Sequence, residues 1–340
     1  MIVSLKADAN PAEVLRALVS RGLWVSQVER NASGEPRHYV IASYSAATSA
    51  EELATIEGIS SVTTSKVEHP RVTAQGPVVD VAGVSVGAGA PAFMVGPCSV
   101  ESEAHIREIA ERLAPLGVAF LRGGAYKPRT SPYAFQGHGE VALGWLRRAA
   151  EATKMKVVTE ALSEADVPAV AELADLVQVG SRNMQNYALL KAVGRTGRPV
   201  LLKRGMSATM DEWLHSGEYL LAGGSRGVIF CERGIRSFDD ATRNLLDLGA
   251  VALLAHVHKL PVIVDPSHGA GRRDLIVPLG RAALAAGAAG LMIETHADPA
   301  SALSDGPQAI PLGEITAVMR ELRGSGARSA GALSPNGGAS

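Results

Sequence analysis

The chain contains 340 residues, of which 46% are hydrophobic and 20% are charged, and its formal net charge at pH 7 is −1. This composition is typical of a globular protein with one large and one small domain, and it excludes the overall basic character of a nucleic-acid-binding protein. Only two cysteines, Cys98 and Cys231, are present, which excludes a disulfide framework. Without a long apolar run or a signal-peptide pattern, we expect a cytoplasmic protein with no membrane or nucleic-acid partner.

Residues 1 to about 70 predict a small domain with the order β-α-β-β-α-β. Its expected elements are strands at 2–5, 23–28, 38–42 and 62–67, and helices that begin after Asn10 and Ser49. This order is the ferredoxin-like, or split βαβ, pattern. Such a domain can bind a small ligand or pair with a second copy, and a purely structural role is the alternative.

Residues 71–92 predict a linker that ends in a hairpin at 78–86, which can close one end of the following domain. From Phe93 onward, short apolar runs alternate with helical stretches. The eight runs are 93–95, 118–121, 156–159, 176–179, 199–202, 227–230, 261–264 and 290–293. Continuous apolar runs are typical of buried parallel strands, and eight β-α units predict a (β/α)8 TIM barrel over residues 93–323.

A doubly wound open sheet is the alternative to the barrel, but no Gly-x-Gly-x-x-Gly motif follows the first run. Residues 324–340 are rich in Gly, Ser, Ala and Pro, and we expect this tail to be disordered.

Polar residues follow every expected strand, at the end where barrels build active sites. The second strand is followed by the loop 121–131, which combines Arg122, two adjacent glycines, Lys127 and the sequence Pro128-Arg129-Thr130. These residue types hold phosphate or carboxylate oxygens, so the loop predicts an anion site. A solvated surface loop is the alternative.

A possible metal site follows the strands that become neighbours when the barrel closes. Cys98 follows the first strand, His268 the seventh and Glu294 the eighth, and Asp305 lies in the next loop. A thiolate, an imidazole and two carboxylates can bind one divalent metal ion, but this mixed set does not choose among Mn, Fe, Co, Zn and Cu. The alternatives are a buried core cysteine and a hydrogen-bonded histidine. Cys231 is interpreted as structural.

The remaining strand ends carry a second, cationic group. Its members are Arg122, Lys127, Arg129, Arg182, Lys203 and Arg233. So many cations around one cavity are unstable without anions, which predicts substrates rich in phosphate and carboxylate. Ser181 can add a donor. Neutralisation by Glu160, Glu232 and Asp265 is the alternative.

The motifs at these strand ends together resemble those of the 3-deoxy-D-arabino-heptulosonate 7-phosphate (DAHP) synthases of the type Iβ class. The matching stretches are 96–101, 121–131, 180–183, 202–205, 231–236 and 265–269. The resemblance implies condensation of phosphoenolpyruvate with erythrose 4-phosphate and water, which opens the shikimate pathway of aromatic amino acid biosynthesis. It also implies a homo-oligomer, by analogy a homotetramer.

The resemblance assigns roles to individual residues. It implies metal ligation by Cys98, His268, Glu294 and Asp305, and catalysis by Lys127 together with Cys98 and His268. The implied phosphoenolpyruvate ligands are Arg122, Lys127, Arg182, Lys203 and Arg233, and the implied erythrose 4-phosphate ligands are Lys127, Pro128, Arg129 and Thr130. Ser181 is a further expected substrate-binding residue. The N-terminal domain resembles, by pattern only, a regulatory domain through which Tyr or Phe inhibits the barrel.

Three alternatives to this function remain open. The sister family that makes 3-deoxy-D-manno-octulosonate 8-phosphate uses arabinose 5-phosphate, although the loop 127–131 favours the four-carbon sugar. A Schiff-base aldolase would use Lys203. A non-catalytic amino-acid sensor would keep the barrel without turnover.

Overall fold

The computed structural model describes residues 1–31, 33–42, 45–64, 68–127 and 131–324. These form two compact units, Met1–Glu68 and a second unit that begins at His69. Within the described residues, no helix combines the length and the hydropathy needed to cross a membrane. The tail that we expect to be disordered lies, from residue 325 onward, outside the described residues.

The first unit has the predicted order β-α-β-β-α-β. Its elements are β1 (Ile2–Leu5), α1 (Pro11–Val19), β2 (Val25–Arg30), β3 (Pro36–Ile41), α2 (Ala50–Ala54) and β4 (Ile59–Thr63). The antiparallel sheet has the order β2-β3-β1-β4, and the side chains of Asn10 and Ser49 cap the two helices as predicted. The last strand begins at Ile59 rather than at 62, because Ile59 is buried and pairs with Leu5.

The segment expected to be a linker contains a helix, α3 (Pro70–Gln75), before the hairpin of β5 (Val79–Val81) and β6 (Val84–Val86). The carboxylate of Glu218, in α8 (Met210–Gly223), accepts hydrogen bonds from the backbone N–H groups of Arg71 and Val72 at 2.9–3.1 Å. The first turn of a helix needs such acceptors. This contact is long-range, so the local sequence did not indicate the helix.

The second unit is a closed barrel of eight parallel strands, which confirms the predicted fold. The strands are β7 (Ala92–Gly96), β8 (Phe120–Arg122), β9 (Lys156–Glu160), β10 (Leu176–Val179), β11 (Val200–Lys203), β12 (Val228–Glu232), β13 (Val262–Val264) and β14 (Gly290–His296). They pair in chain order, and β14 closes the ring by pairing with both β13 and β7. A short strand, β15 (Ile310–Pro311), extends the sheet beside β14.

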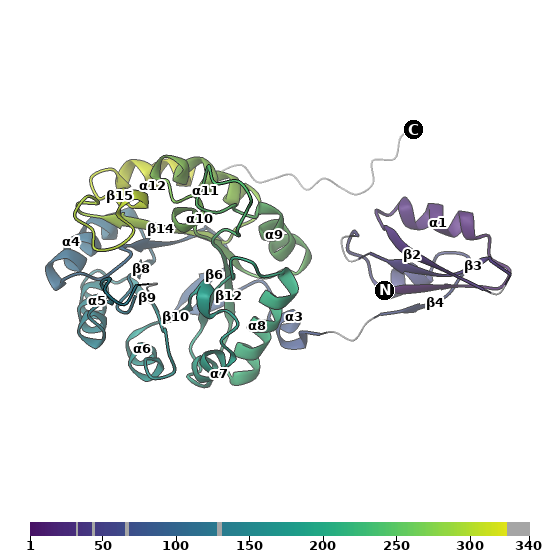
Figure 1. Cartoon of the computed structure of the whole chain (residues 1–340), viewed down its shortest axis with the longest axis horizontal. Helices are drawn as coiled ribbons and strands as arrows, with labels where there is room; N and C mark the ends of the chain where they lie inside the picture. Colours follow the sequence, from purple (N-terminus) through teal and green to yellow (C-terminus); the bar gives the residue numbers. More distant parts are fainter. Residues whose placement is uncertain (32, 43–44, 65–67, 128–130, 325–340) are drawn as a thin grey trace. The chain divides into compact units, whose positions relative to one another are not determined.

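Helices surround the strands (Figure 1). They are α4 (Glu103–Leu113), α5 (Glu140–Ala152), α6 (Val167–Leu173), α7 (Tyr187–Arg195), α8, α9 (Leu248–Ala252), α10 (Pro266–Ala270), α11 (Ile276–Ala285) and α12 (Ile315–Gly324). Short helical turns follow or precede them at η1 (Ala114–Leu116), η2 (Ser181–Asn183), η3 (Leu253–Val257), η4 (Arg273–Leu275) and η5 (Gly306–Gln308).

The barrel has two apolar layers because successive strand residues point to opposite faces. In β7, Phe93 and Val95 pack outward among the helices, whereas Ala92 and Met94 pack inside the barrel. Val79, Val81 and Val86 of the hairpin belong to the inner cluster. The hairpin therefore closes one end of the barrel, as predicted, and the polar strand ends lie at the other.

Candidate functional site

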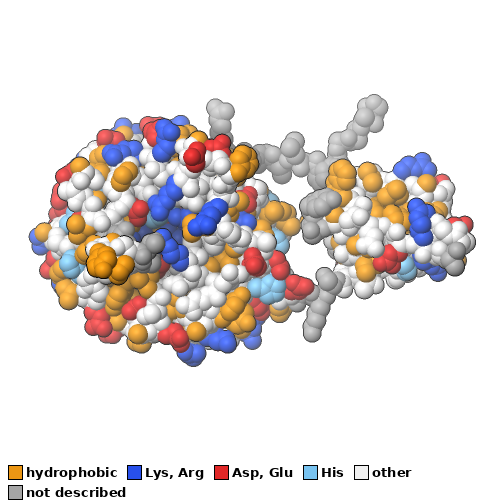
Figure 2. All heavy atoms as spheres, viewed as in Figure 1, with side chains coloured by type: hydrophobic (Ala, Val, Ile, Leu, Met, Phe, Trp, Pro, Cys, Tyr) orange, Lys and Arg blue, Asp and Glu red, His pale blue; other side chains and the backbone are white. Residues whose placement is uncertain are grey.

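The carboxyl ends of the barrel strands surround a cavity of about 170 Å³. Its lining is rich in cations, and Lys and Arg side chains gather over the middle of the barrel (Figure 2). The lining residues are Arg122, Lys127, Glu160, Gln178, Gly180, Ser181, Arg182, Lys203, Met206, Arg233, Arg243, His268 and Asp305. This set contains every described residue that the sequence assigned to substrate binding.

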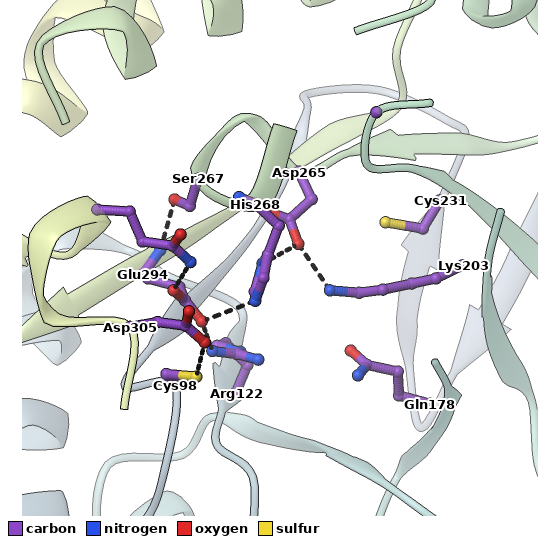
Figure 3. Close-up of polar contacts among 12 residues, drawn as sticks. Cys98, Arg122, Gln178, Lys203, Cys231, Asp265, Ser267, His268, Glu294 and Asp305 are labelled. Atoms are coloured by element: carbon purple, nitrogen blue, oxygen red, sulfur yellow. Dashed lines mark hydrogen bonds and ion pairs between the residues drawn. The ribbon is translucent and has the colours of Figure 1, made fainter. Parts of the chain in front are cut away.

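The four predicted metal ligands converge at one side of this cavity (Figure 3). One ligand atom each from Cys98, His268, Glu294 and Asp305 lies within 4.8 Å of the others. Cys98 follows β7, His268 lies in α10, Glu294 lies in β14 and Asp305 immediately precedes η5. A sulfur, an imidazole nitrogen and two carboxylate oxygens at these separations fit one divalent cation of the borderline type.

The contacts within this cluster bring the four candidate ligand atoms close together. The Cys98 thiol donates to Asp305 Oδ2 at 3.0 Å, and His268 Nε2 lies 3.3 Å from Glu294 Oε1. Burial, with the nearby carboxylate of Glu294, raises the pKa of the Cys98 thiol to about 12. A cation that binds there must displace the thiol proton.

The charge of Glu294 is stabilised although its side chain is fully buried. Burial alone would raise the pKa of Glu294, but the positive charges of His268 and Arg122 outweigh it and lower the pKa. Arg122 Nη1 donates to Glu294 Oε1 at 2.7 Å and to the backbone oxygen of Pro97 at 2.9 Å. The carboxylate is therefore ionised and ready to bind a cation.

Asp265 orients the imidazole of His268. Its Oδ2 lies 2.7 Å from His268 Nδ1 and accepts from Lys203 Nζ at 2.6 Å. Burial opposes the ionised form of Asp265, but these two positive partners hold its pKa well below the usual value. Because an ionised carboxylate only accepts, Nδ1 carries a proton, and Nε2 faces the cluster.

Lys127 contacts the same cluster from the loop after β8. Its Nζ lies 2.8 Å from Cys98 Sγ and 3.0 Å from the backbone oxygen of Cys98. A Cβ atom at Gly124 would lie only 2.7 Å from the Cys98 oxygen and 2.9 Å from Lys127 Cδ. The glycine therefore allows the loop to bring Lys127 against Cys98.

The cations of the cavity are of two kinds. Lys203 is neutralised by Asp265 and Arg122 by Glu294, but Arg182 and Arg233 have no carboxylate partner among the described residues. The carboxylate of Glu232, a candidate to neutralise the cations of the cavity, instead binds Arg204 at 3.1 Å. Burial lowers the pKa of Arg233 and outweighs the opposing charge of Asp265, which indicates a desolvated cation without a close ion-pair partner among the described residues.

Three buried donor atoms of the cavity have no hydrogen-bond partner among the residues that the structure describes: Arg122 Nε, Ser181 Oγ and Arg233 Nη1. Buried polar atoms in native proteins are nearly always paired, so unpaired ones at a cavity indicate a missing ligand. Because guanidinium groups only donate, the ligand must offer acceptor oxygens.

The structure adds residues that the sequence motifs did not indicate. Arg243 binds Asp305 Oδ1 and Gln308 Oε1, and Gln308 in turn donates to Glu294. Gln178 Nε2 donates to Glu160 Oε2 at 2.7 Å, so within the described residues Glu160 is bound by an amide. Arg243 lies between β12 and α9, and Gln308 lies in η5. Neither directly follows a strand, which is the signal that located most of the other residues. The expected sugar-phosphate ligands Pro128, Arg129 and Thr130 lie outside the described residues.

Comparison with known proteins adds the family. A family model described as the DAHP synthetase I family matches residues 62–326, which is most of the chain. The chain belongs to the DAHP synthetase I family. This confirms the predicted resemblance and favours an enzyme over a non-catalytic sensor.

Relatives of this DAHP synthetase family member support the assignment. A phospho-2-dehydro-3-deoxyheptonate aldolase from Thermotoga maritima is 50% identical over 255 residues, which are 75% of this chain and 74% of the relative. A 2-dehydro-3-deoxyphosphooctonate aldolase from Acidithiobacillus ferrooxidans is 35% identical over 261 residues, 71% of this chain and 92% of the relative.

Solved structures of DAHP synthases are also similar to this chain. The crystal structure of a DAHP synthase from Thermotoga maritima matches with a TM-score of 0.74 and 41% identity, over 95% of this chain and 96% of that chain. A truncated form of the Thermotoga maritima enzyme matches with a TM-score of 0.68 and 47% identity, over 73% of this chain and 90% of that chain. The chain is therefore an enzyme of the DAHP synthase class.

Proposed function

We propose that this protein condenses phosphoenolpyruvate with erythrose 4-phosphate and water, giving DAHP and phosphate as the first step of the shikimate pathway. The observation that carries the proposal is the set of unpaired buried donors, Arg122 Nε, Ser181 Oγ and Arg233 Nη1, beside the four-residue cluster. Phosphoenolpyruvate has a phosphate and a carboxylate on adjacent carbons, and both groups offer only acceptors at neutral pH.

The substrate roles follow from charge and position. The cations without carboxylate partners, Arg182 and Arg233, bind the phosphate of phosphoenolpyruvate. Arg122 and Lys203, whose charges are already balanced by Glu294 and Asp265, orient the carboxylate and the bridging region through their remaining N–H groups. The loop 127–131 binds the sugar phosphate.

The cluster of Cys98, His268, Glu294 and Asp305 holds one divalent cation in this proposal. When bound, the cation supplies Lewis-acid activation of either the aldehyde oxygen or the attacking water. Asp265 keeps the Nε2 lone pair of His268 available for it, and Lys127 stabilises the Cys98 thiolate that forms when the thiol proton leaves.

In the reaction, C3 of phosphoenolpyruvate bonds to the aldehyde carbon of the sugar, and the aldehyde oxygen becomes an alkoxide. Lys127 donates a proton to this oxygen. Water adds to C2, and the bond between C2 and the phosphate oxygen breaks to release phosphate. The added oxygen becomes the C2 carbonyl, and its two protons pass to the departing phosphate and back to Lys127. Arg182 and Arg233 stabilise the negative charge of the departing phosphate.

A coupled assay that follows phosphoenolpyruvate consumption and phosphate release tests this function. We expect turnover with erythrose 4-phosphate and none, or far less, with arabinose 5-phosphate. The octulosonate alternative has weaker support, because the Acidithiobacillus ferrooxidans relative is 35% identical to this chain, whereas the heptonate aldolase is 50% identical. Turnover with arabinose 5-phosphate alone would establish that alternative.

A Schiff-base mechanism requires a free amine, whereas Lys203 Nζ is buried in an ion pair 2.6 Å from Asp265. Borohydride should therefore trap no substrate on Lys203, and a trapped adduct would overturn the metal mechanism.

Regulation by Tyr or Phe through the first unit, and assembly into a homotetramer, are part of the same proposal. They rest on the β-α-β-β-α-β order and on the family resemblance. Sedimentation analysis and inhibition assays with each aromatic amino acid test them.

A further inference from the structure

The two carboxylates of the metal cluster each have an inner and an outer oxygen. The inner oxygens face the cluster, because Glu294 Oε1 lies 3.3 Å from His268 Nε2 and Asp305 Oδ2 accepts from the Cys98 thiol at 3.0 Å. The outer oxygens point away from these partners. Glu294 Oε2 accepts from Gln308 Nε2, and Asp305 Oδ1 accepts from Arg243 Nη1 at 3.2 Å.

The outer contacts form one connected chain. Arg243 Nη1 also donates to Gln308 Oε1 at 2.9 Å, so a single guanidinium nitrogen contacts both Asp305 and the amide that binds Glu294. Nη1 carries two hydrogens and can donate to both. The chain Asp305–Arg243–Gln308–Glu294 therefore links the two carboxylates behind the cluster.

The orientation of the Gln308 amide is determined by its partners. Gln308 Nε2 donates to Glu294 Oε2, so the amide nitrogen faces the carboxylate. Arg243 can only donate, so the amide oxygen must face Arg243. A reversed amide would lose both hydrogen bonds, and Gln308 is only 3% exposed, where water cannot replace them readily.

The backbone around Gln308 is held by close packing. Gln308 ends η5, and the next residues form β15 beside β14. The hydroxyl of Thr295 donates to the oxygen of Ile310 at 2.8 Å, and a Cβ at Gly306 would lie 2.2 Å from the backbone oxygen of Pro299. Gln308 therefore approaches Glu294 from an anchored segment.

We propose that Gln308, supported by Arg243, is a positioning residue that makes Glu294 and Asp305 each present one defined oxygen to the cation. The terminal torsion of a Glu or Asp side chain is broad, so a carboxylate without an outer partner can rotate. Hydrogen-bond partners behind metal ligands typically change metal affinity by about 10- to 100-fold. This inference rests on the proposed metal site.

Isothermal titration of the metal-free full-length protein with Mn²⁺ tests the inference without using activity. Gln308→Met keeps the length and removes both hydrogen bonds, and we expect its Kd to be about 10- to 100-fold weaker than that of the wild type. Gln308→Asn keeps the amide but holds it farther from Glu294 and Arg243, and we expect an intermediate loss of Mn²⁺ affinity. In steady-state assays of these variants, the Mn²⁺ concentration for half-activation should rise by a larger factor than the KM for phosphoenolpyruvate does.

The matched control is Gln75→Met. Gln75 uses both amide atoms, with Nε2 donating to the Val228 oxygen at 2.9 Å and Oε1 accepting from the Val228 N–H at 2.6 Å. It has no contact with the cluster, so we expect its Mn²⁺ affinity to equal that of the wild type. A purely structural role for Gln308 would give both Met variants similar losses of thermal stability and unchanged Mn²⁺ affinity.

The outcomes separate this inference from the proposed function. Mn²⁺ binding to the wild type with an unchanged Kd, within twofold, in both Gln308 variants would overturn the positioning role alone. If the wild type bound no divalent cation, the proposed metal site and this inference would both be wrong. Weakened binding in the Gln308 variants with intact binding in Gln75→Met would support it.

Discussion

Two buried arginines on neighbouring strand ends, Arg204 and Arg233, differ in whether a carboxylate balances their charge. Arg204 pairs with Glu232 at 3.1 Å and with Asp247 at 2.8 Å, so its charge is balanced within the protein. Arg233 is equally buried, but no carboxylate partner is present among the described residues, and its Nη1 is unpaired. The first arginine is structural, and the second is available to a ligand.

This contrast predicts opposite effects of the same substitution. Arg233→Gln should lower kcat/KM for phosphoenolpyruvate by roughly 10- to 150-fold, the equivalent of about 1.5–3 kcal/mol for a hydrogen bond to a charged group. It should leave the free energy of unfolding of the ligand-free protein unchanged or higher, because it removes an uncompensated buried cation. Steady-state kinetics and urea denaturation measure the two effects.

The matched control is Arg204→Gln, which leaves Glu232 and Asp247 without their cation. We expect it to lower the free energy of unfolding by about 3–5 kcal/mol. Destabilisation of similar size in Arg233→Gln would contradict the assignment of Arg233 to ligand binding.

The second cysteine gives a prediction from its pKa. Cys231 is fully buried among the apolar side chains inside the barrel, and burial raises the pKa of its thiol to about 12. A raised pKa depletes the reactive thiolate at every pH below 12, so labelling at pH 8 should be on the order of a thousandfold slower than for an ordinary thiol. Iodoacetamide labelling of the Cys98→Ala variant isolates Cys231, and unfolding in urea should restore the ordinary rate. Rapid labelling of the native variant would contradict the burial.

The hairpin of β5 and β6 contributes to the stability of the barrel, whereas the carboxyl ends of the strands carry the proposed site. The hairpin side chains Val79, Val81 and Val86 complete the inner apolar cluster, at the end of the barrel away from the cations. In TIM barrels the end opposite the active site serves stability. Substitutions in the hairpin should therefore affect folding without affecting chemistry.

Val81→Ala tests this separation. The fully buried side chain loses two methyl groups and leaves a cavity, so we expect the free energy of unfolding to fall by about 2 kcal/mol. The kcat and the KM for phosphoenolpyruvate should stay within twofold of the wild type. An unchanged unfolding midpoint, or a large loss of kcat, would show that the hairpin has another role.

For the whole molecule, the two units differ in what they contribute. All described residues of the proposed site belong to the second unit, which begins at His69, and the truncated Thermotoga maritima form matches 73% of this chain. The catalytic unit therefore contains everything that the proposed reaction requires.

Deletion of residues 1–68 should leave the kcat for condensation within a few-fold of that of the full chain. Any inhibition by Tyr or Phe in the full chain should disappear in the shortened protein, because the proposed effector domain is absent. Inhibition that survives the deletion would place the effector site in the barrel.

Metal removal tests the proposed mechanism for the whole enzyme. Treatment with EDTA should abolish phosphoenolpyruvate consumption, and added Mn²⁺ should restore it, because the cation activates the aldehyde or the water. The Cys98→Ser variant should need a higher Mn²⁺ concentration for activity. Full activity in the presence of excess EDTA would contradict the metal mechanism.

The local sequence determined the barrel strands, the order of the first unit and which four residues form the candidate metal cluster. Each buried strand is a continuous apolar run, and closure of a barrel brings all carboxyl strand ends to one face. Cys98, His268 and Glu294 could therefore be placed together from their positions relative to the strands alone. The same argument placed Arg182, Lys203 and Arg233 around one cavity.

Only the tertiary structure decided which charges pair and which remain free. Arg204 and Arg233 both follow strands and both have an acidic residue nearby in the fold, yet Glu232 points to Arg204. Arg243 and Gln308 could not be predicted, because they reach the cluster from segments beyond the strand ends, whose course depends on distant contacts such as β15 beside β14. Strand position is a local property, whereas the partner of a buried charge is determined by long-range packing.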